Sequence, residues 1–335
     1  MRIPYQDVES KLKQILINEG LVEDRAKLIA QIFTDASTDG YHSHGVNRFC
    51  EFVKNIRRGI IIAGNDPVLQ QSLGAIEQWD GQFGPGPSNA HFAMGRAIDL
   101  ARVQGMSCVA LANTNHWMRG GTYGWQAAEA DCLAICFTNT MPNMAPWGGM
   151  THTTGNNPLI IAVPRKEGHL VLDMSMTQFS YGQLYKHRLE GKMLPLSGGY
   201  DEKGQLTNDP SKILETKRLL PTGYWKGSGL SLMLDLLATL LSRGQSTADI
   251  GKRSSESALS QIFICIEKSK LGSTADHDQL VNQIVAHFTS SVPEKDAPNI
   301  RYPGSETQLR RKRNRREGIP INEEIWKKVL ELEKI

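Results

Sequence analysis

The chain has 335 residues, 22% of them charged and 40% hydrophobic, which is long enough for two domains and typical of a soluble globular protein. Its formal net charge is +3, but residues 310–316 contain six basic residues. The remainder therefore carries a formal −3, which disfavours a broad nucleic-acid-binding face. The most apolar helical stretch, residues 230–241, is too short to span a bilayer, and no secretory signal is recognisable near Met1. We therefore expect a cytoplasmic protein without a membrane partner.

The N-terminal segment is expected to form three helices. Apolar residues recur at helical spacing from Val8 to Leu16, and a second helix is expected over about residues 22–37. A third helix is expected to begin near Gly45. In that frame His44 lies at the helix N-terminus and Arg48 lies one turn later on the same side.

The sequence DGYHSHGVNRF at residues 39–49 precedes and opens this third helix, and three interpretations fit it. His42, His44 and His116 could bind a metal, although no HExxH or DxDxDG pattern accompanies them. Alternatively, His44 could protonate the carbonyl of a 2-keto acid while Arg48 binds its carboxylate, with Ser43 as a further hydrogen-bond donor. The third interpretation is a loop followed by a solvated helix. Acid/base chemistry fits the pattern better than a metal site does.

From about residue 73 the pattern changes to alternating helices and strands. Strands are expected at residues 106–112, 133–138, 158–164, 169–175 and 260–267, with helices at about 90–103 and 229–242. Polar turns follow several of these strands, which is typical of an α/β enzyme with its site at the strand ends. Residues 198–210 are expected to form a turn-rich loop, and Asn322 is expected to cap a final helix over about residues 323–332.

Neither GxGxxG nor GxxxxGK[ST] occurs, so the sequence supports neither an ordinary Rossmann site nor a P-loop. Backbone N–H groups at a helix N-terminus can nevertheless bind a phosphate without such a motif. The sequence LPTGYWKGSGLSL at residues 220–232 offers flexible glycines, the cation Lys226 and a helix that opens near Gly227 to Gly229. An anion site and a plain turn both remain open for this segment.

Two further features concern the cysteines and the basic run. The five cysteines are scattered and form no CxxC pair, so we expect free thiols in a reducing compartment. Cys132 and Cys136 lie in an expected buried strand. The basic run at residues 310–316 is expected to be a solvated helix face, and binding of RNA or of a membrane surface is the alternative.

Five stretches taken together resemble one known family. They are SHGVNRF, NHWMRGGTYGWQAAE, GNNPLI, LDMSMTQFSYG and LPTGYWKGSGLSLMLDLLATLLS. They are similar to segments of the type-2 malate/L-lactate dehydrogenases, which are NAD(P)H-dependent reductases unrelated to the Rossmann-type dehydrogenases. The resemblance extends from Asp39 to Trp326.

The resemblance implies an α/β fold particular to this family. A non-Rossmann NAD-binding α/β domain over residues 71–304 would pack with a helical domain that carries the catalytic histidine. Residues 1–70 and 305–335 would form the helical domain. The resemblance also implies a homodimer that acts on a small-molecule 2-keto acid, without a nucleic-acid partner.

The resemblance further implies individual site residues. It places the proton donor at His44 and the substrate contacts at Ser43, Arg48 and His116, without a metal. Cofactor contacts are implied for Leu170, Val171, Leu172, Asp173, Met174, Ser175, Met176, Trp225, Lys226, Gly304, Ser305 and Glu306. NADH is the implied cofactor and NADPH the alternative, because a carboxylate at Glu306 would accept from a ribose hydroxyl and repel a 2′-phosphate. The chain departs from the family pattern at Asn156, where relatives usually carry threonine.

Overall fold

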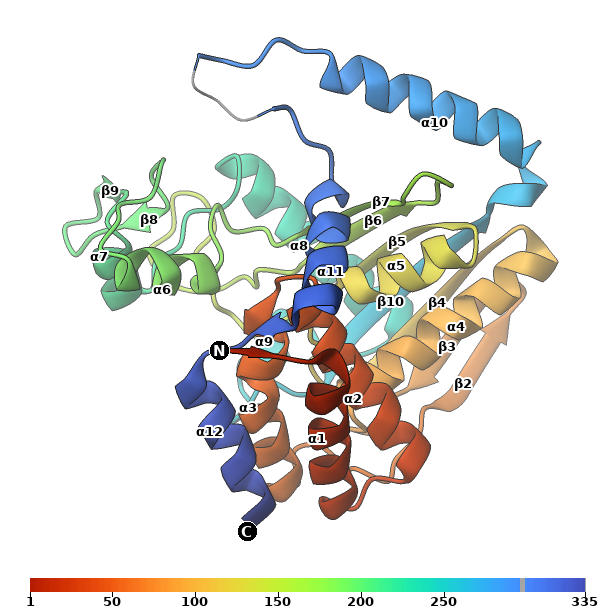
Figure 1. The fold of residues 1–335 in the computed structure, drawn as a ribbon, viewed down its shortest axis with the longest axis horizontal. Coiled ribbons are helices and arrows are strands. Elements are labelled where there is room, and N and C mark those ends of the chain that lie inside the picture. Colours follow the sequence, from red (N-terminus) through yellow and green to blue (C-terminus); the bar gives the residue numbers. More distant parts are fainter. Residues whose placement is uncertain (296–298, 335) are drawn as a thin grey trace.

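A seven-stranded mixed sheet forms the centre of the computed structural model, which describes residues 1–295 and 299–334 (Figure 1). The strands lie in the order β2 (Val68–Leu73), β3 (Ile76–Asp80), β4 (Met106–Thr114), β10 (Leu259–Glu267), β5 (Cys132–Thr138), β6 (Leu159–Val163) and β7 (Leu170–Met174). Within this sheet β3 and β4 run parallel, and the other neighbouring pairs are antiparallel. The predicted α/β fold and its five predicted strands are confirmed. The edge strand β2 was not predicted, because all six of its residues are exposed and its sequence lacks an apolar alternation.

Helices cover both faces of the sheet. Helices α4 (Gly86–Gln104) and α5 (Gly121–Glu129) pack on one face, and α8 (Trp225–Ser242) packs on the other. Alternation along β10 explains both contacts, since Phe263 packs on the α4 side and Ile262 on the α8 side. All five cysteines are free thiols, as predicted.

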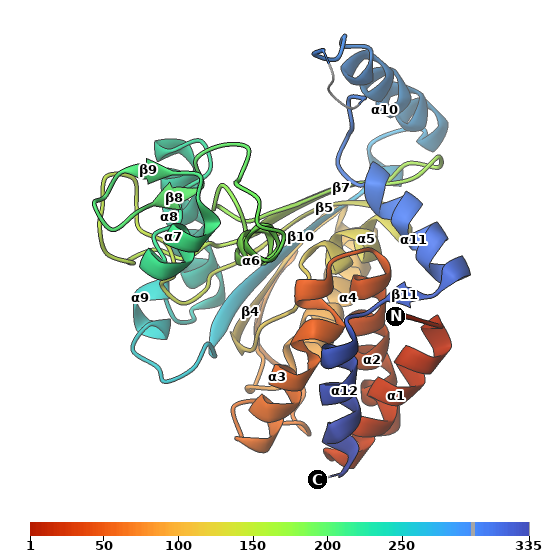
Figure 2. The same cartoon turned by 60° about the vertical axis from the view of Figure 1, so that its left-hand side comes forward.

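The N-terminal helices form a separate hydrophobic cluster with the last helix. Helices α1 (Tyr5–Asn18), α2 (Glu23–Thr38), α3 (Val46–Arg57) and α12 (Glu323–Glu331) lie together in Figures 1 and 2. Strand β1 (Arg2–Ile3) also pairs with β11 (Ile319–Pro320), so that two distant parts of the chain meet. Asn322 accepts hydrogen bonds from the N–H groups of Glu324 and Ile325, which confirms it as an N-cap. The division into two domains stays a prediction.

Smaller elements lie around this frame. They are η1 (His42–His44), α6 (Tyr181–Leu189), β8 (Gly199–Tyr200), β9 (Leu206–Thr207), α7 (Pro210–Thr216), α9 (Thr247–Ile250), η2 (Lys268–Lys270), α10 (Thr274–Thr289), α11 (Ser305–Glu317) and η3 (Leu332–Lys334). Residues 198–210 are more ordered than expected, because β8 and β9 pair as a short antiparallel ladder. Figures 1 and 2 both show α10 projecting away from the sheet. Within the described ranges, no helix combines the length and apolarity needed to cross a membrane.

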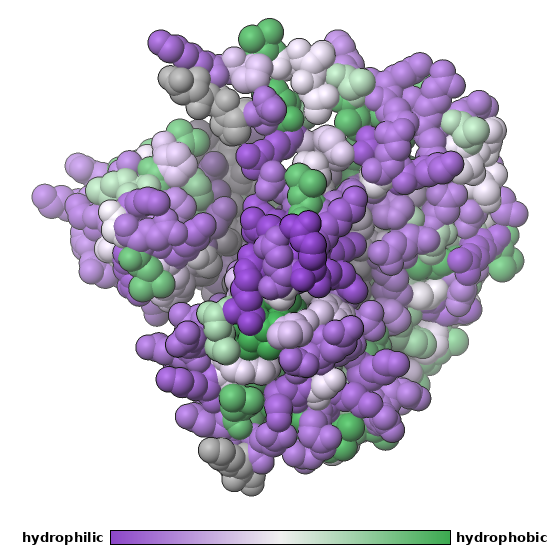
Figure 3. Space-filling view, viewed as in Figure 1, coloured by the Kyte–Doolittle hydropathy of each residue, from purple (hydrophilic) through white to green (hydrophobic). Residues whose placement is uncertain are grey.

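Helix α11 carries the basic run and appears as a dark purple, hydrophilic ridge in Figure 3. Lys312 and Arg313 are exposed, as a solvated helix face requires. The same expectation is wrong for Arg311, whose guanidinium donates two hydrogen bonds to Asp39 at 2.7 and 2.8 Å. Arg315 similarly pairs with Asp35 at 2.9 Å. These contacts attach α11 to α2.

Candidate active site

A cleft of about 1230 Å³ lies between η1, α3, the segment after β4, the end of β7 and α6. Among the residues that line it are the predicted site residues Ser43, His44, Arg48, His116, Asp173, Met174 and Ser175. These residues come from three separate segments of the chain, residues 43–48, 116 and 173–175. The structure therefore brings the predicted substrate residues together with part of the predicted cofactor segment.

A tight turn between α2 and α3 presents His44 to this cleft. Helix α2 ends at Thr38, and Gly40 follows with a positive φ of 89°, which turns the chain sharply. At Gly45 a Cβ atom would lie 2.1 Å from the Oγ of Ser37, so only glycine permits this approach of the turn to α2. The Ser37 hydroxyl in turn accepts the N–H of Val46, the first residue of α3, at 2.9 Å.

The environment of His44 favours its neutral form. Burial is the main cause that lowers its pKa to about 4; Arg48 and Arg119 lower it further, while Asp173 opposes them. The Nδ1 atom lies 3.0 Å from the hydroxyl of Ser43. Ser43 is thus placed to orient the imidazole as well as to meet a ligand.

His116 lies beside His44, with the ring centroids 5.7 Å apart and the ring planes inclined by 23°. Its Nδ1 accepts the N–H of Met118 at 2.9 Å, so the proton of the neutral ring is on Nε2. Burial lowers the pKa of His116 well below its ordinary value, and the charges of Arg48 and His44 add to this effect. His116 is therefore a neutral N–H donor.

Arg48 lies one turn into α3, where the sequence predicted it, and its guanidinium meets an unpredicted carboxylate. The Nη2 atom lies 3.9 Å from Oε2 of Glu256, in the segment before β10. Burial raises the pKa of Glu256 above its ordinary value, and Arg48 opposes that rise. The sequence around Glu256, SSESALS, gave no signal of this contact.

A buried ion-pair network extends from the turn that carries His44 to β7. Asp39, only 1% exposed, accepts hydrogen bonds from Arg311 and from Arg119. Arg119 is 3% exposed and its Nε lies 3.6 Å from Oδ2 of Asp173, which also accepts the N–H of Gly121 at 2.9 Å. Sequence analysis missed Arg119 and Asp39, although both lie within stretches that it had singled out.

The predicted cofactor segment at residues 170–176 coincides with β7 and the turn after it. Asp173, Met174 and Ser175 line the cleft. The side chains of Val171 and Met176 are buried in the core, so a ligand in the cleft could reach only their backbone. Leu170 and Leu172 flank Val171 on the edge strand of the sheet.

Trp225 and Lys226 lie at the start of α8 and do not line the cleft within the described part of the chain. Trp225 is 66% exposed and is therefore not a core residue. The N–H groups of Lys226, Gly227 and Ser228 already bond to carbonyl oxygens, at 3.2, 2.9 and 3.3 Å. They are thus not the free phosphate donors expected at this helix N-terminus.

The third predicted cofactor segment begins α11, beside β7. Gly304, with a φ of 95°, lies against the backbone of Val171, and the Ser305 hydroxyl donates to the carbonyl of Tyr302 at 2.8 Å. Glu306 forms ion pairs with Arg301 at 3.2 Å and Arg310 at 3.4 Å. Because Arg310 lines the cleft, this segment reaches the site through that arginine. Among the described residues, no three His, Cys, Asp or Glu side chains are grouped to hold a metal.

Comparison with known proteins identifies the class of the molecule. The family described as malate/L-lactate dehydrogenase matches residues 3–330, so the chain belongs to that family. It is an oxidoreductase that acts on CH–OH groups, and membership of this dehydrogenase family indicates a nicotinamide cofactor. The predicted resemblance is thereby confirmed.

Individual relatives narrow this class. The chain is 44% identical over 330 residues to 2,3-diketo-L-gulonate reductase of Salmonella heidelberg, covering 98% of this chain and 99% of the relative. The enzyme of the same name from Escherichia coli O127:H6 is 43% identical over the same shares.

Solved structures agree on the fold. Malate dehydrogenase of Entamoeba histolytica has a TM-score of 0.93 at 23% identity, covering 100% of this chain and 97% of that one. A putative malate/lactate dehydrogenase from E. coli has a TM-score of 0.91 at 26% identity, with 100% and 95% covered.

Proposed function

We propose that the chain is an NADH-dependent reductase of 2-keto acids, in which His44 donates the proton and Arg48 binds the substrate carboxylate. The observation that carries this proposal is the meeting of His44, Arg48, His116 and Asp173 in one cleft. His44 as a proton donor and Arg48 as a carboxylate-binding guanidinium lie four residues apart. Together they suit a small molecule with adjacent carbonyl and carboxylate groups. The relatives named above support the same chemistry.

The cleft suits a nicotinamide cofactor together with a small acid. Its volume of about 1230 Å³ exceeds the roughly 300–1,000 Å³ typical of a site for one drug-sized ligand. Asn143 lines the cleft, and its buried Oδ1 has no hydrogen-bond partner among the described residues. The buried Nε of Arg119 also makes no hydrogen bond there, although it lies 3.6 Å from Asp173. Such atoms suit amide and hydroxyl groups of a ligand. NADH, when bound, supplies the hydride that reduces the carbonyl carbon.

The chain's own residues would control the proton. The ligand-free His44 is neutral at pH 7, because its pKa is about 4. A carboxylate bound to Arg48 would neutralise one of the charges that lower this pKa, so substrate binding itself would favour protonated His44. Neutral His116 would hold the substrate oxygen from its Nε2–H, and Asp173 would stabilise the imidazolium of His44.

As substrate we propose 2,3-diketo-L-gulonate, reduced to 3-dehydro-L-gulonate, in carbohydrate metabolism. The 44% identity to reductases of that name over nearly the whole chain supports it. The alternative within the family is a malate/lactate-type 2-hydroxyacid dehydrogenase, which two structural neighbours at 26% identity support, a malate dehydrogenase and a putative malate/lactate dehydrogenase. A panel of 2-keto acids assayed by consumption of NADH, and in parallel of NADPH, tests both. Turnover of 2,3-diketo-L-gulonate far above that of pyruvate and oxaloacetate is expected, and no turnover of any acid would reject the proposal.

We further propose a cytoplasmic homodimer. Helix α8 exposes a run of large apolar side chains, namely Leu232, Met233, Leu236, Leu237 and Leu240, which supports burial against a second copy.

Five free thiols support a reducing compartment. The alternative of nucleic-acid binding by the basic run loses support, because Arg311 and Arg315 pair with carboxylates of α2. Light scattering should give the mass of a dimer for the parent chain. It should give the mass of a monomer for the Leu240→Glu variant, because the substitution places a charge on the exposed apolar face of α8.

A further inference from the structure

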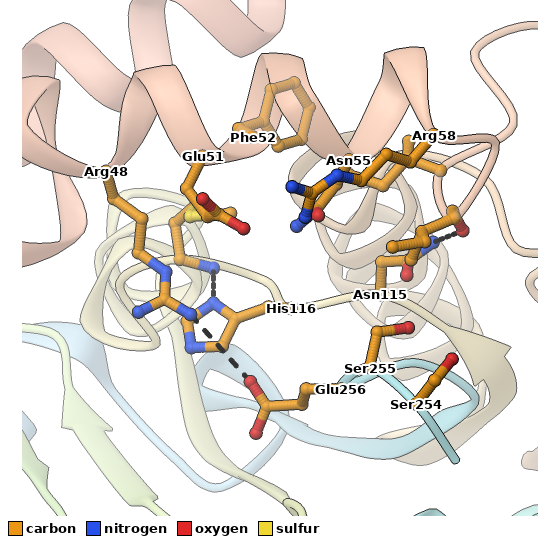
Figure 4. Close-up of a pocket in the computed structure, with 13 residues that line it drawn as sticks. Arg48, Glu51, Phe52, Asn55, Arg58, Asn115, His116, Ser254, Ser255 and Glu256 are labelled. Carbon is orange, nitrogen blue, oxygen red and sulfur yellow. Dashed lines mark hydrogen bonds and ion pairs between the residues drawn. The ribbon is translucent and has the colours of Figure 1, made fainter.

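A second cavity, here called the side pocket, opens beside the cleft (Figure 4). Its volume is about 420 Å³, and Arg48, His116, Met118 and Glu256 line both cavities. The side pocket is lined by Arg48, Glu51, Phe52, Asn55, Arg58, Ile60, Ile61, Asn115, His116, Met118, Ser254, Ser255 and Glu256. A molecule bound at Arg48 and His116 therefore has access to both spaces.

The walls of the side pocket are rich in polar groups that remain available. In Figure 4 no dashed line joins the side chains of Glu51, Asn55 or Arg58 to the other side chains drawn. Asn115 is 2% exposed, and its Oδ1 has no partner in the described part of the chain, although its amide nitrogen donates to Phe83 and Gly84 carbonyls. Buried polar groups are normally satisfied, so an unpartnered acceptor beside a cavity suits a ligand that brings donors.

Glu256 stands where the two cavities meet. Its side chain is 19% exposed, and the 3.9 Å separation from Arg48 is an ion pair without the short contact of a hydrogen bond. The backbone N–H of Met141 also interacts with this carboxylate, whose remaining lone pairs can accept hydrogen bonds from a ligand. Two residues later Ala258 is buried with a φ of 60°, a conformation that L-residues rarely adopt and that clusters at functional sites.

A 2-keto acid of three or four carbons carries no hydroxyl groups with which to fill this space. Pyruvate ends in a methyl group. Oxaloacetate ends in a carboxylate that would meet the like charges of Glu256 and Glu51, with Arg58 as the opposing cation on the pocket wall. A chain of carbons that each carry a hydroxyl would offer uncharged donors and acceptors to a pocket of this polarity.

We propose that the side pocket binds the hydroxylated carbon chain of a 2-keto acid and that Glu256 selects it, accepting hydrogen bonds from its hydroxyls and repelling a second carboxylate. This inference rests on the proposed reductase function and assigns the specificity of that same site. In this proposal Glu256 determines specificity. Because Glu256 also contacts Arg48, selection of the hydroxylated carbon chain of the substrate is linked to binding of the substrate carboxylate.

The test measures kcat/KM with NADH for three acids, namely pyruvate, oxaloacetate and 2-keto-L-gulonate, which has hydroxyls along its chain. Because Glu256→Gln also alters Arg48, the readout is the ratio between acids. The ratio of 2-keto-L-gulonate to pyruvate should fall about tenfold, the worth of one hydrogen bond to a charged group. The ratio of oxaloacetate to pyruvate should rise. Glu202→Gln, an exposed acid in a remote turn, is the matched control and should change neither ratio.

A second variant keeps the proposal testable if Glu256→Gln does not fold. Ser254 is exposed at the side pocket, so Ser254→Leu should fold and should lower the 2-keto-L-gulonate to pyruvate ratio by filling space. Unchanged ratios in an active Glu256→Gln or Ser254→Leu enzyme would overturn the side-pocket assignment and leave the reductase function standing. A parent chain that reduces none of the three acids, nor 2,3-diketo-L-gulonate, would overturn both.

Discussion

His44 and His116 lie ring beside ring, 5.7 Å apart, and the positive charge of either one lowers the pKa of the other. Burial lowers both pKa values, so neither ring is an imidazolium at neutral pH in the free protein. The Met118 N–H fixes the tautomer of His116, whereas the side-chain hydrogen bond of His44 among the described residues is to the rotatable hydroxyl of Ser43. This asymmetry favours His44 as the member that exchanges a proton with a substrate.

Replacing His44 tests the proton donor. His44→Ala should lower kcat by about 10²- to 10⁴-fold, the usual contribution of a positioned general acid, while NADH binding measured by fluorescence titration stays close to the parent value. His42→Ala is the matched control from the same turn, and its loss should be much smaller. A His44→Ala enzyme with nearly normal kcat would remove this residue from the mechanism.

The pH dependence follows from the lowered pKa of His44. The imidazolium is populated in the free protein only near and below the pKa of about 4, so kcat/KM for keto-acid reduction should fall as the pH rises above that value. Asp173 stabilises the imidazolium, and Asp173→Asn should shift the fall to still lower pH. Initial rates across pH, on protein whose folding is verified by circular dichroism, give both profiles. A profile that is flat, or one that Asp173→Asn moves upward, contradicts the assignment.

Arg48→Lys separates carboxylate binding from catalysis. The substitution keeps the charge and loses the planar guanidinium, so kcat/KM for a 2-keto acid should fall by roughly tenfold or more. The loss should be smaller for an aldehyde substrate that lacks the carboxylate. Equal losses for both substrates would mean that Arg48 has a structural role, through its contact with Glu256 or its place in α3.

The choice of cofactor depends on Glu306 and its two arginine partners. Glu306→Gln removes the carboxylate that would repel a 2′-phosphate and also releases Arg301 and Arg310 from their ion pairs. The ratio of NADPH to NADH in kcat/KM should therefore rise by about tenfold or more. Lys312→Gln, on the exposed side of the same helix, serves as the control. An unchanged ratio would place the ribose of the cofactor away from Glu306.

The Arg311–Asp39 contact predicts a difference in stability between two arginines of one helix. Arg311→Gln should lower the free energy of unfolding by roughly 3 kcal/mol, because it leaves the buried carboxylate of Asp39 with Arg119 alone. Arg313→Gln, an exposed neighbour, should change it by less than about 0.5 kcal/mol. Urea denaturation followed by circular dichroism measures both. Equal effects would mean that the ion pair contributes no stability.

Local features of the fold follow from the sequence. Helical spacing of Phe49 and Phe52 predicted α3, the placement of Gly45 predicted its start, and Asn322 predicted the start of α12. These predictions succeed because each depends on residues within one or two turns of one another. The turn that presents His44 and the helical spacing of Arg48 belong to this class.

Contacts between distant segments could not be read from the pattern. Glu256 meets Arg48 only because the segment before β10 passes the first turn of α3, and the strand order that brings it there has no local signal. At α8, Tyr224 adopts a φ of 60° and starts the helix at Trp225, which consumes the N–H groups expected to be free. A tyrosine in the left-handed region is uncommon, so sequence patterns do not predict it.

The pairing of Asp39 with Arg311 joins residues that are 272 positions apart. Closing so long a loop is entropically costly and slow compared with forming α1 or α2 alone. During synthesis the turn that carries His44 would therefore leave the ribosome early. The carboxylate of Asp39 could not pair with Arg311 until α11 had also been synthesised. Catalytic competence would then be among the last properties that the nascent chain acquires, and a chain cut short before residue 311 would have the histidine without the contact that anchors its turn.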